Sequence, residues 1–153
     1  MSKIDFQKRF AESPFAYRLH NFVFLFDKIA DDVLQREHGI TLSQFVVLKI
    51  LTHTHDCKQK NIAEKLHMTE GAISRQIERL RENGFITRTT NKSNRREHEI
   101  NVTEKGMIVR KNALETLSKE MAFIGQALTD EEMSHFENAI EKLHECVVKY
   151  TNS

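Results

Sequence analysis

Apolar residues recur at helical spacing near the start of the chain. Between Phe15 and Val33 they are separated alternately by four and three positions, which places them on one stripe of a long helix. Gly39 is suited to end this helix. A second helix is predicted to follow as far as about His53, because "TLSQ" at 41–44 has the pattern of a capping box. The stripe consists of Phe15, Leu19, Phe22, Phe26, Ile29 and Val33, and the second helix carries Phe45, Val46, Leu48, Ile50 and Leu51.

The next apolar pattern predicts two short helices separated by a tight break. Thr69 is a good N-cap for the second of them, and Asn83-Gly84 is a suitable end. Helix, brief turn and helix is the organisation of a helix-turn-helix. The inward positions are Ile62, Ala63 and Leu66 in the first helix and Ile73, Ile77 and Leu80 in the second.

A β-hairpin is predicted after the helix-turn-helix. Phe85 and Ile86 open a short strand, and residues 98–102 return with Ile100 and Val102 on one face. The stretch "TRTTNKSNRREHEINVT" at 87–103 has four cations, two acids and no apolar side chain before Ile100. We therefore expect it to form the tip of the hairpin.

Two more helices with heptad-like apolar repeats are predicted at the C-terminal end. Thr103 can cap the first, and Thr129 with Glu132 forms another capping box. With the N-terminal helix, they have more apolar surface than a small basic module can cover, which favours self-association. The repeats are Leu114, Leu117, Met121, Ile124 and Leu128, then Met133, Phe136, Ile140, Leu143, Val147 and Tyr150.

Composition supports a mostly α protein of one domain. The chain has 153 residues, with 39% hydrophobic and 29% charged residues, one proline and five glycines. No apolar segment approaches the roughly 20 residues that span a bilayer, and the N-terminus does not resemble a signal peptide. Cys57 and Cys146 are too far apart to indicate a disulfide framework. We therefore expect a cytoplasmic protein without membrane insertion.

The formal net charge of +1 conceals a split between segments. Residues 58–102 carry ten Lys or Arg against six Asp or Glu, a net of +4, while the rest carries thirteen against sixteen, a net of −3. Such an asymmetry hints at a local site for a polyanion.

The second helix of the helix-turn-helix has an exposed face suited to DNA. A helix fits the major groove, and short side chains let it approach the base edges. Arg75 can contact guanine and Gln76 can contact adenine, whereas the acid Glu70 has the alternative role of stabilising the helix dipole. The candidate DNA-binding residues of this helix are Thr69, Gly71, Ala72, Ser74, Arg75, Gln76 and Arg79.

The segment "IAEKLHMTEGAISRQIERLRENGFITR", followed by a polar loop with "NRR" and by "INVTEKG", resembles the winged helix-turn-helix of the MarR family of bacterial transcriptional regulators. The resemblance extends over nearly the whole chain. The family commonly has Asp-Arg-Arg in the loop and Leu-Thr-x-x-Gly at the next helix. Here the matching residues are Asn94, Arg95 and Arg96, then Val102, Thr103 and Gly106. Asn94 and Val102 depart from the family pattern, and Asn94 removes a carboxylate that would orient a neighbouring arginine.

The resemblance implies a single MarR-type domain over 1–153. In such a domain a dimerisation helix occupies about 8–37, the winged helix-turn-helix about 41–102 and two dimerisation helices about 103–150. It implies a homodimer that represses transcription by binding a near-palindromic operator. Lys92, Asn94, Arg95 and Arg96 are then expected at the wing. Many members release DNA when a small aromatic or phenolic compound binds. Phe15, Leu19, Phe22 and Phe45 are the candidate ligand contacts, although helical core and dimer seam are the alternative for each.

The sequence also contains residues that could serve other functions. His53, His55, Asp56 and Cys57 offer metal ligands, but the spacing of a closed metal site is missing. Cys57 or Cys146 could sense oxidants, although redox-sensing relatives usually carry the cysteine in the first helix. No catalytic constellation or cofactor fingerprint appears, so we expect neither an enzyme nor a cofactor. The remaining alternatives are a redox- or metal-responsive regulator and a helical protein-interaction module that does not bind DNA.

Overall fold

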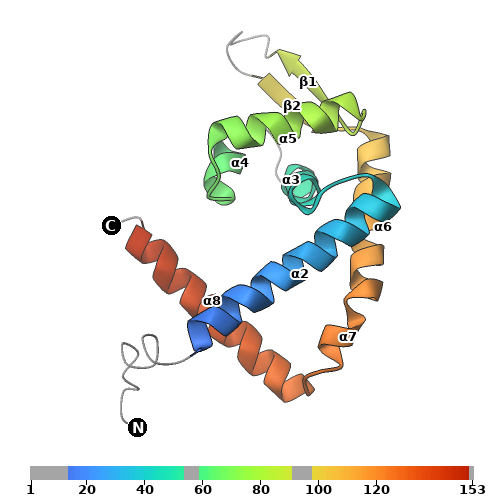
Figure 1. The fold of residues 1–153 in the computed structure, drawn as a ribbon. Coiled ribbons are helices and arrows are strands. Elements are labelled where there is room, and N and C mark those ends of the chain that lie inside the picture. The colour runs from blue at the N-terminus through green and yellow to red at the C-terminus, as the bar shows by residue number, and fades with distance from the viewer. Residues whose placement is uncertain (1–13, 54–58, 91–97, 152–153) are drawn as a thin grey trace. The chain divides into compact units, whose positions relative to one another are not determined.

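The structure, a computed structural model, describes residues 14–53, 59–90 and 98–151. Within these residues the chain forms helices and one antiparallel hairpin (Figure 1). This confirms the prediction of a mainly α fold with a small β-hairpin. The elements are α2 (Phe15–His38), α3 (Leu42–His53), α4 (Gln59–Lys65), α5 (Glu70–Glu82), β1 (Ile86–Thr90), β2 (His98–Val102), α6 (Glu104–Glu120), α7 (Ala122–Gly125) and α8 (Asp130–Thr151).

The chain divides into two compact units between Leu117 and Ser118. The first unit contains α2 to β2 and most of α6, and the second contains the last residues of α6 with α7 and α8. None of the helices in the described part of the chain has the length and apolar character that crossing a membrane requires.

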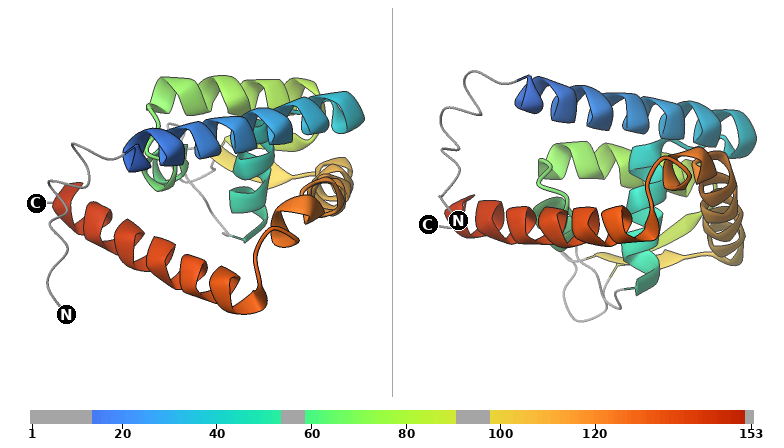
Figure 2. Two further views of the ribbon diagram at one scale, coloured as in Figure 1. Left: turned by 60° about the horizontal axis from the view of Figure 1, so that its bottom comes forward. Right: turned by 90° about the horizontal axis from the view of Figure 1, so that it is seen from below.

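The first unit is built around α3, which packs against α2, α5 and β2. Strand β2 packs against α3 and β1 against α5, and the right view of Figure 2 shows the hairpin beside α3. The inward positions predicted for the helix-turn-helix are confirmed, since all are buried except Leu66, which is half-buried. Leu34, Val47, Leu48, Ile86 and Ile100 complete this core from the neighbouring elements.

Both predicted capping boxes are present. The backbone N–H of Thr41 donates to Gln44 Oε1 at 2.9 Å, and that of Gln44 donates to Thr41 Oγ1 at 3.2 Å. In the second unit, Thr129 N–H donates to Glu132 Oε2 at 2.9 Å, and Glu132 N–H donates to Thr129 Oγ1 at 3.3 Å. These reciprocal bonds satisfy backbone donors at the starts of α3 and α8.

Three helices of the first unit end with a residue in the left-handed region. Gly39 (φ 65°) and Gly84 (φ 72°) follow α2 and α5, as predicted. After α4 the position is occupied by His67 (φ 50°), whose N–H donates to Glu64 O at 3.2 Å while Met68 N–H donates to Ala63 O at 3.0 Å. This bond pair is the Schellman arrangement, in which glycine is the usual residue. A side chain at His67 therefore holds a conformation that favours glycine.

We expect His67→Gly to raise the free energy of unfolding by about 0.5 to 1 kcal/mol, because glycine has no Cβ penalty in this region. Urea denaturation followed by circular dichroism measures the change. The reciprocal variant Gly84→Ala places a Cβ at φ 72° and should lower the free energy of unfolding by about 1 kcal/mol. A loss of stability in His67→Gly would contradict this account of the turn.

The hairpin differs from the prediction at its start. Phe85 is not part of the strand, because its N–H donates to Leu80 O at 2.9 Å and so belongs to the end of α5. β1 instead runs from Ile86 to Thr90, into the polar stretch that we expected to form the tip. Its β-branched threonines favour an extended strand although they are polar. Residues 91–97 lie outside the described part of the chain.

The first C-terminal helix also differs from the prediction. The apolar repeat from Leu114 to Leu128 indicated one helix, but α6 ends at Glu120, a turn follows at Met121, and α7 covers only Ala122–Gly125. The bond from Ile124 N–H to Met121 O, at 3.0 Å, spans three residues rather than four. The apolar spacing continues through this break and therefore could not reveal it.

Candidate nucleic-acid interface

The helix-turn-helix is formed by α4 and α5, which pack against each other and are joined by residues 66–69. Ile73, Ile77 and Leu80 hold the inner side of α5 in the core. Thr69 caps the helix, since its Oγ1 accepts a hydrogen bond from Ala72 N–H at 3.2 Å. These contacts fix which side of α5 faces outward.

The outward side of α5 carries small and polar residues. Gly71 is exposed, with no neighbouring atom within 4 Å of the place a Cβ would take, so the start of the helix is open to close approach. The Oε1 atom of Gln76 is buried and lacks a hydrogen-bond partner among the described residues. Of the candidate residues, Thr69, Gly71, Arg75 and Arg79 are exposed, and Ala72, Ser74 and Gln76 are half-buried.

The charged residues of α5 leave the guanidinium groups of Arg75 and Arg79 available to an external partner, as far as the described residues show. Among the residues that the structure describes, neither Arg75 nor Arg79 forms an ion pair, whereas Arg81 pairs with Glu78. The pKa of the Glu78 carboxyl lies below its usual value because Arg81 donates a hydrogen bond to it, and the charges of Arg81 and Arg88 act in the same direction. The Glu78 carboxylate is thus offset by neighbouring cations.

The starts of α4 and α5 are connected by Gln59, a residue that the sequence pattern did not single out. Its Nε2 donates a hydrogen bond to the backbone oxygen of Glu70 at 3.1 Å. Glu70 is exposed in the first turn of α5, where an acidic side chain favours the positive end of the helix dipole. Gln59 could not be found from local sequence, because its partner lies eleven residues away.

The hairpin has one strand of the predicted wing on each side of residues 91–97. Ile86 pairs with Val102, and Arg88 pairs with Ile100. The apolar side of the hairpin packs on the core through Ile86 and Ile100, while Arg88 is exposed on β1. Lys92, Asn94, Arg95 and Arg96 all lie outside the described residues. Arg88, which was not among the predicted wing residues, is therefore a further exposed cation of the hairpin.

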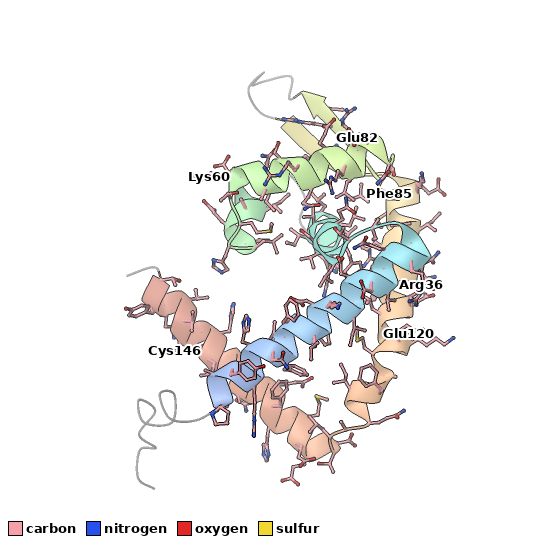
Figure 3. All side chains as sticks on the ribbon, in the orientation of Figure 1. Arg36, Lys60, Glu82, Phe85, Glu120 and Cys146 are labelled. Carbon is pink, nitrogen blue, oxygen red and sulfur yellow. The ribbon has the colours of Figure 1, made fainter. Side chains whose placement is uncertain are left out.

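The end of α5 is bonded to the start of α6 at what we call the α5–α6 junction. Thr103 Oγ1 donates to Gly84 O at 2.8 Å, Thr103 N–H donates to Phe85 O at 3.0 Å, and Lys105 Nζ donates to Asn83 O at 2.8 Å. In Figure 3, Phe85 lies where α5 ends and α6 begins. A Cβ on Gly106 would lie 2.1 Å from Phe85 O, so only glycine fits at this position without a shift of the backbone. The junction comprises Asn83, Gly84, Phe85, Thr103, Lys105 and Gly106.

The four candidate ligand contacts do not share one environment. Phe15 and Phe22 are 48% and 45% exposed on α2, and Leu19 is half-buried, whereas Phe45 is only 6% exposed and belongs to the core of the first unit. The ring centroids of Phe22 and Phe26 are 6.2 Å apart, and the two ring planes are tilted relative to each other. A hollow of about 330 Å³ in this unit includes none of the four, since it lies between the ends of α2 and α5 and the start of α3.

The candidate metal and thiol residues are only partly described. His53 is exposed at the end of α3, and His55, Asp56 and Cys57 lie outside the described residues. Over residues 14–53, 59–90 and 98–151, no three His, Cys, Asp or Glu side chains are grouped as metal ligands. Cys146 is an exposed free cysteine on α8 (Figure 3).

Known proteins share both the sequence pattern and the fold. A model of the MarR family matches residues 40–98. The chain is 30% identical, over 128 residues, to an uncharacterized HTH-type transcriptional regulator of Bacillus cereus, covering 83% of this chain and 84% of that protein. It is 31% identical, over 121 residues, to the HTH-type transcriptional repressor MdtR of Bacillus subtilis, covering 78% of each. The crystal structure of MarR superposes with a TM-score of 0.76 at 25% identity, covering 88% of this chain and 93% of that one.

Proposed function

The chain belongs to the MarR family of DNA-binding transcriptional regulators, and we propose that it acts as a homodimeric repressor of a near-palindromic operator. Proteins of this family are transcriptional regulators rather than enzymes. The observation that carries the proposal is the outward side of α5, where Arg75 and Arg79 are exposed without an ion pair among the described residues. Exposed arginines without a competing ion pair are suited to phosphates and to guanine edges.

In this proposal α5 is the recognition helix. Its open start at Gly71 and its half-buried Ala72 and Ser74 let the backbone approach the base edges, and Arg75 is placed to contact guanine. The partly inward amide of Gln76 makes it a weaker candidate for base contact than Arg75. Thr69 and Arg79 flank these residues and suit the phosphate backbone.

We assign the wing a role in phosphate or minor-groove contact. Arg88 supports this, because it is an exposed cation on β1 beside the stretch that carries Lys92, Asn94, Arg95 and Arg96. Phosphate contacts release counterions, so operator affinity should fall steeply with salt.

Dimerisation is supported by apolar side chains that remain exposed within the chain. On α8 no residue is buried, and Phe136, Ile140, Leu143, Val147 and Tyr150 recur at spacings of four and three. On α2, Phe15, Phe22, Phe26 and Ile29 are also exposed. A soluble protein normally covers apolar stripes of this size through association. We therefore assign about 8–37 and 103–150 to a dimerisation layer.

Leu143→Glu should weaken the dimer by about tenfold or more, because it would place a charge without a partner in an apolar interface. Sedimentation equilibrium of the full chain measures the dissociation constant. The matched control is Asn138→Glu, which adds the same charge to an exposed polar position of α8. Equal dissociation constants for the two variants would show that the stripe is not the interface.

The proposed release by a small aromatic compound is supported by the exposed phenylalanines of α2, of which Phe22 and Phe26 form a tilted ring pair. Titrating phenol into the protein–operator complex, with fluorescence anisotropy as the readout, tests it. Unchanged anisotropy up to the solubility limit of phenol would count against phenolic control.

The proposed function is tested with the DNA upstream of the protein's own gene. We expect retardation of a fragment that contains an inverted repeat, with half-sites about one helical turn, or 34 to 36 Å, apart. Failure to retard any upstream fragment at low salt would instead favour a protein-interaction module.

A further inference from the structure

Lys105 is absent from the set of residues proposed to contact DNA, yet it contacts the end of the helix that carries them. It lies in the first turn of α6, and its Nζ donates a hydrogen bond to Asn83 O at 2.8 Å. Asn83 is the C-cap of α5. The same ammonium lies 5.0 Å from the centroid of the Phe85 ring. One side chain thus contacts two residues, Asn83 and Phe85, where the recognition helix ends.

The chemistry of this contact is favourable in two ways. The C-terminal end of a helix carries a partial negative charge on its unbonded carbonyls, which attracts a cation. The face of an aromatic ring attracts a cation as well. A charged donor in this position therefore holds the end of α5 more strongly than a neutral one would.

The rest of the α5–α6 junction does not depend on Lys105. Gly84 O and Phe85 O accept hydrogen bonds from the side chain and the backbone N–H of Thr103. Ile73, Ile77 and Leu80 keep α5 in the core. Removing the ammonium should therefore leave the unit folded and weaken the contact that holds the C-cap carbonyl of Asn83 at the end of α5.

We propose that Lys105 is a positioning residue for operator recognition, which sets the angle at which α5 enters the major groove. The inference rests on the proposed binding of an operator through α5. Arg75 lies eight residues from Asn83, or about 12 Å along the helix at 1.5 Å per residue. A tilt of about 5° at Asn83 would move Arg75 by about 1 Å, which is enough to weaken a base contact that depends on hydrogen-bond geometry.

The test compares Lys105→Met, Lys105→Arg and Lys111→Met in the full chain. Methionine keeps an apolar stem beside Phe85 but removes the donor and the charge, and arginine restores both. Lys111 is the matched control, because it is exposed on the same helix and pairs with Glu115 at 3.9 Å. Affinity for the operator and for a random duplex of equal length is measured at several salt concentrations.

We expect Lys105→Met to lower operator affinity about fivefold while affinity for the random duplex, the salt slope and the melting temperature stay unchanged. Lys105→Arg should recover most of the loss, and Lys111→Met should lose nothing. A parallel loss on both duplexes, with a salt slope reduced by about 0.9, would identify a direct phosphate contact and overturn the proposal. Unchanged operator affinity, or a loss explained by a lower melting temperature, would overturn it too. Absence of operator binding by the unsubstituted chain would instead contradict the proposed function.

Discussion

Gly106→Ala should lower the free energy of unfolding by about 2 to 4 kcal/mol. A Cβ at this position would lie 2.1 Å from Phe85 O and 2.8 Å from Val102 Cγ1, so the backbone of the α5–α6 junction would have to move. For a chain of this size the melting temperature should fall by roughly 5 to 15 °C. Differential scanning calorimetry and urea denaturation measure both quantities.

The control for this variant is Gly71→Ala in the same unit. No atom lies within 4 Å of the place its Cβ would take, and alanine is the better helix former. We expect its stability to be equal to that of the unsubstituted chain or slightly higher. If Gly106→Ala were as stable as Gly71→Ala, the close contact with Phe85 would not be the reason for this glycine.

Arg75→Ala should weaken operator binding by about 10-fold to 100-fold and change which sequences are preferred. A bidentate contact to guanine contributes roughly 1 to 3 kcal/mol of discrimination, and Arg75 has no competing ion pair among the described residues. Arg95→Ala and Arg96→Ala should weaken binding to every sequence and reduce the salt slope, because we assign them to phosphates. Fluorescence anisotropy on the operator and on point variants of it separates the two patterns.

Lys111→Ala is the matched control for these arginine variants, since it removes an equal charge from a helix outside the proposed interface. Its affinity should be that of the unsubstituted chain. The assignment of roles would be wrong if all three arginine variants kept full affinity, or if Arg75→Ala left the sequence preference unchanged.

The features predicted well from sequence are those encoded over a few neighbouring residues. The capping box of Thr41 and Gln44, the N-cap of Thr69 and the left-handed Gly84 each depend on residues no more than five positions apart. The inward positions of α4 and α5 also follow from helical periodicity, because a small core fixes which side of each helix is buried.

The features missed depend on contacts between distant residues or on competing local bonds. Phe85 is apolar and precedes a strand, but its bond to Leu80 O assigns it to the helix end. Gln59 and Lys105 are ordinary polar residues by composition. Their hydrogen bonds form only when folding brings them to Glu70 and Asn83, eleven and twenty-two positions away. Gly106 was recognised only as part of a family motif. The physical reason for a glycine there is the close approach of the Phe85 backbone, which leaves no room for a Cβ.

No residue of α8 is buried within the chain, and in the proposed dimer this would make the folding of α8 depend on the protein concentration. Helices in proteins gain most of their stability from packing rather than from intrinsic propensity. If α8 packs only against a second copy, its folding and the association of two chains are one equilibrium governed by mass action. In that case the folded fraction of α8 would rise with the concentration of the protein in the cell. Dilution would unfold α8 before it affects the core of the first unit, whose buried residues pack against one another within one chain.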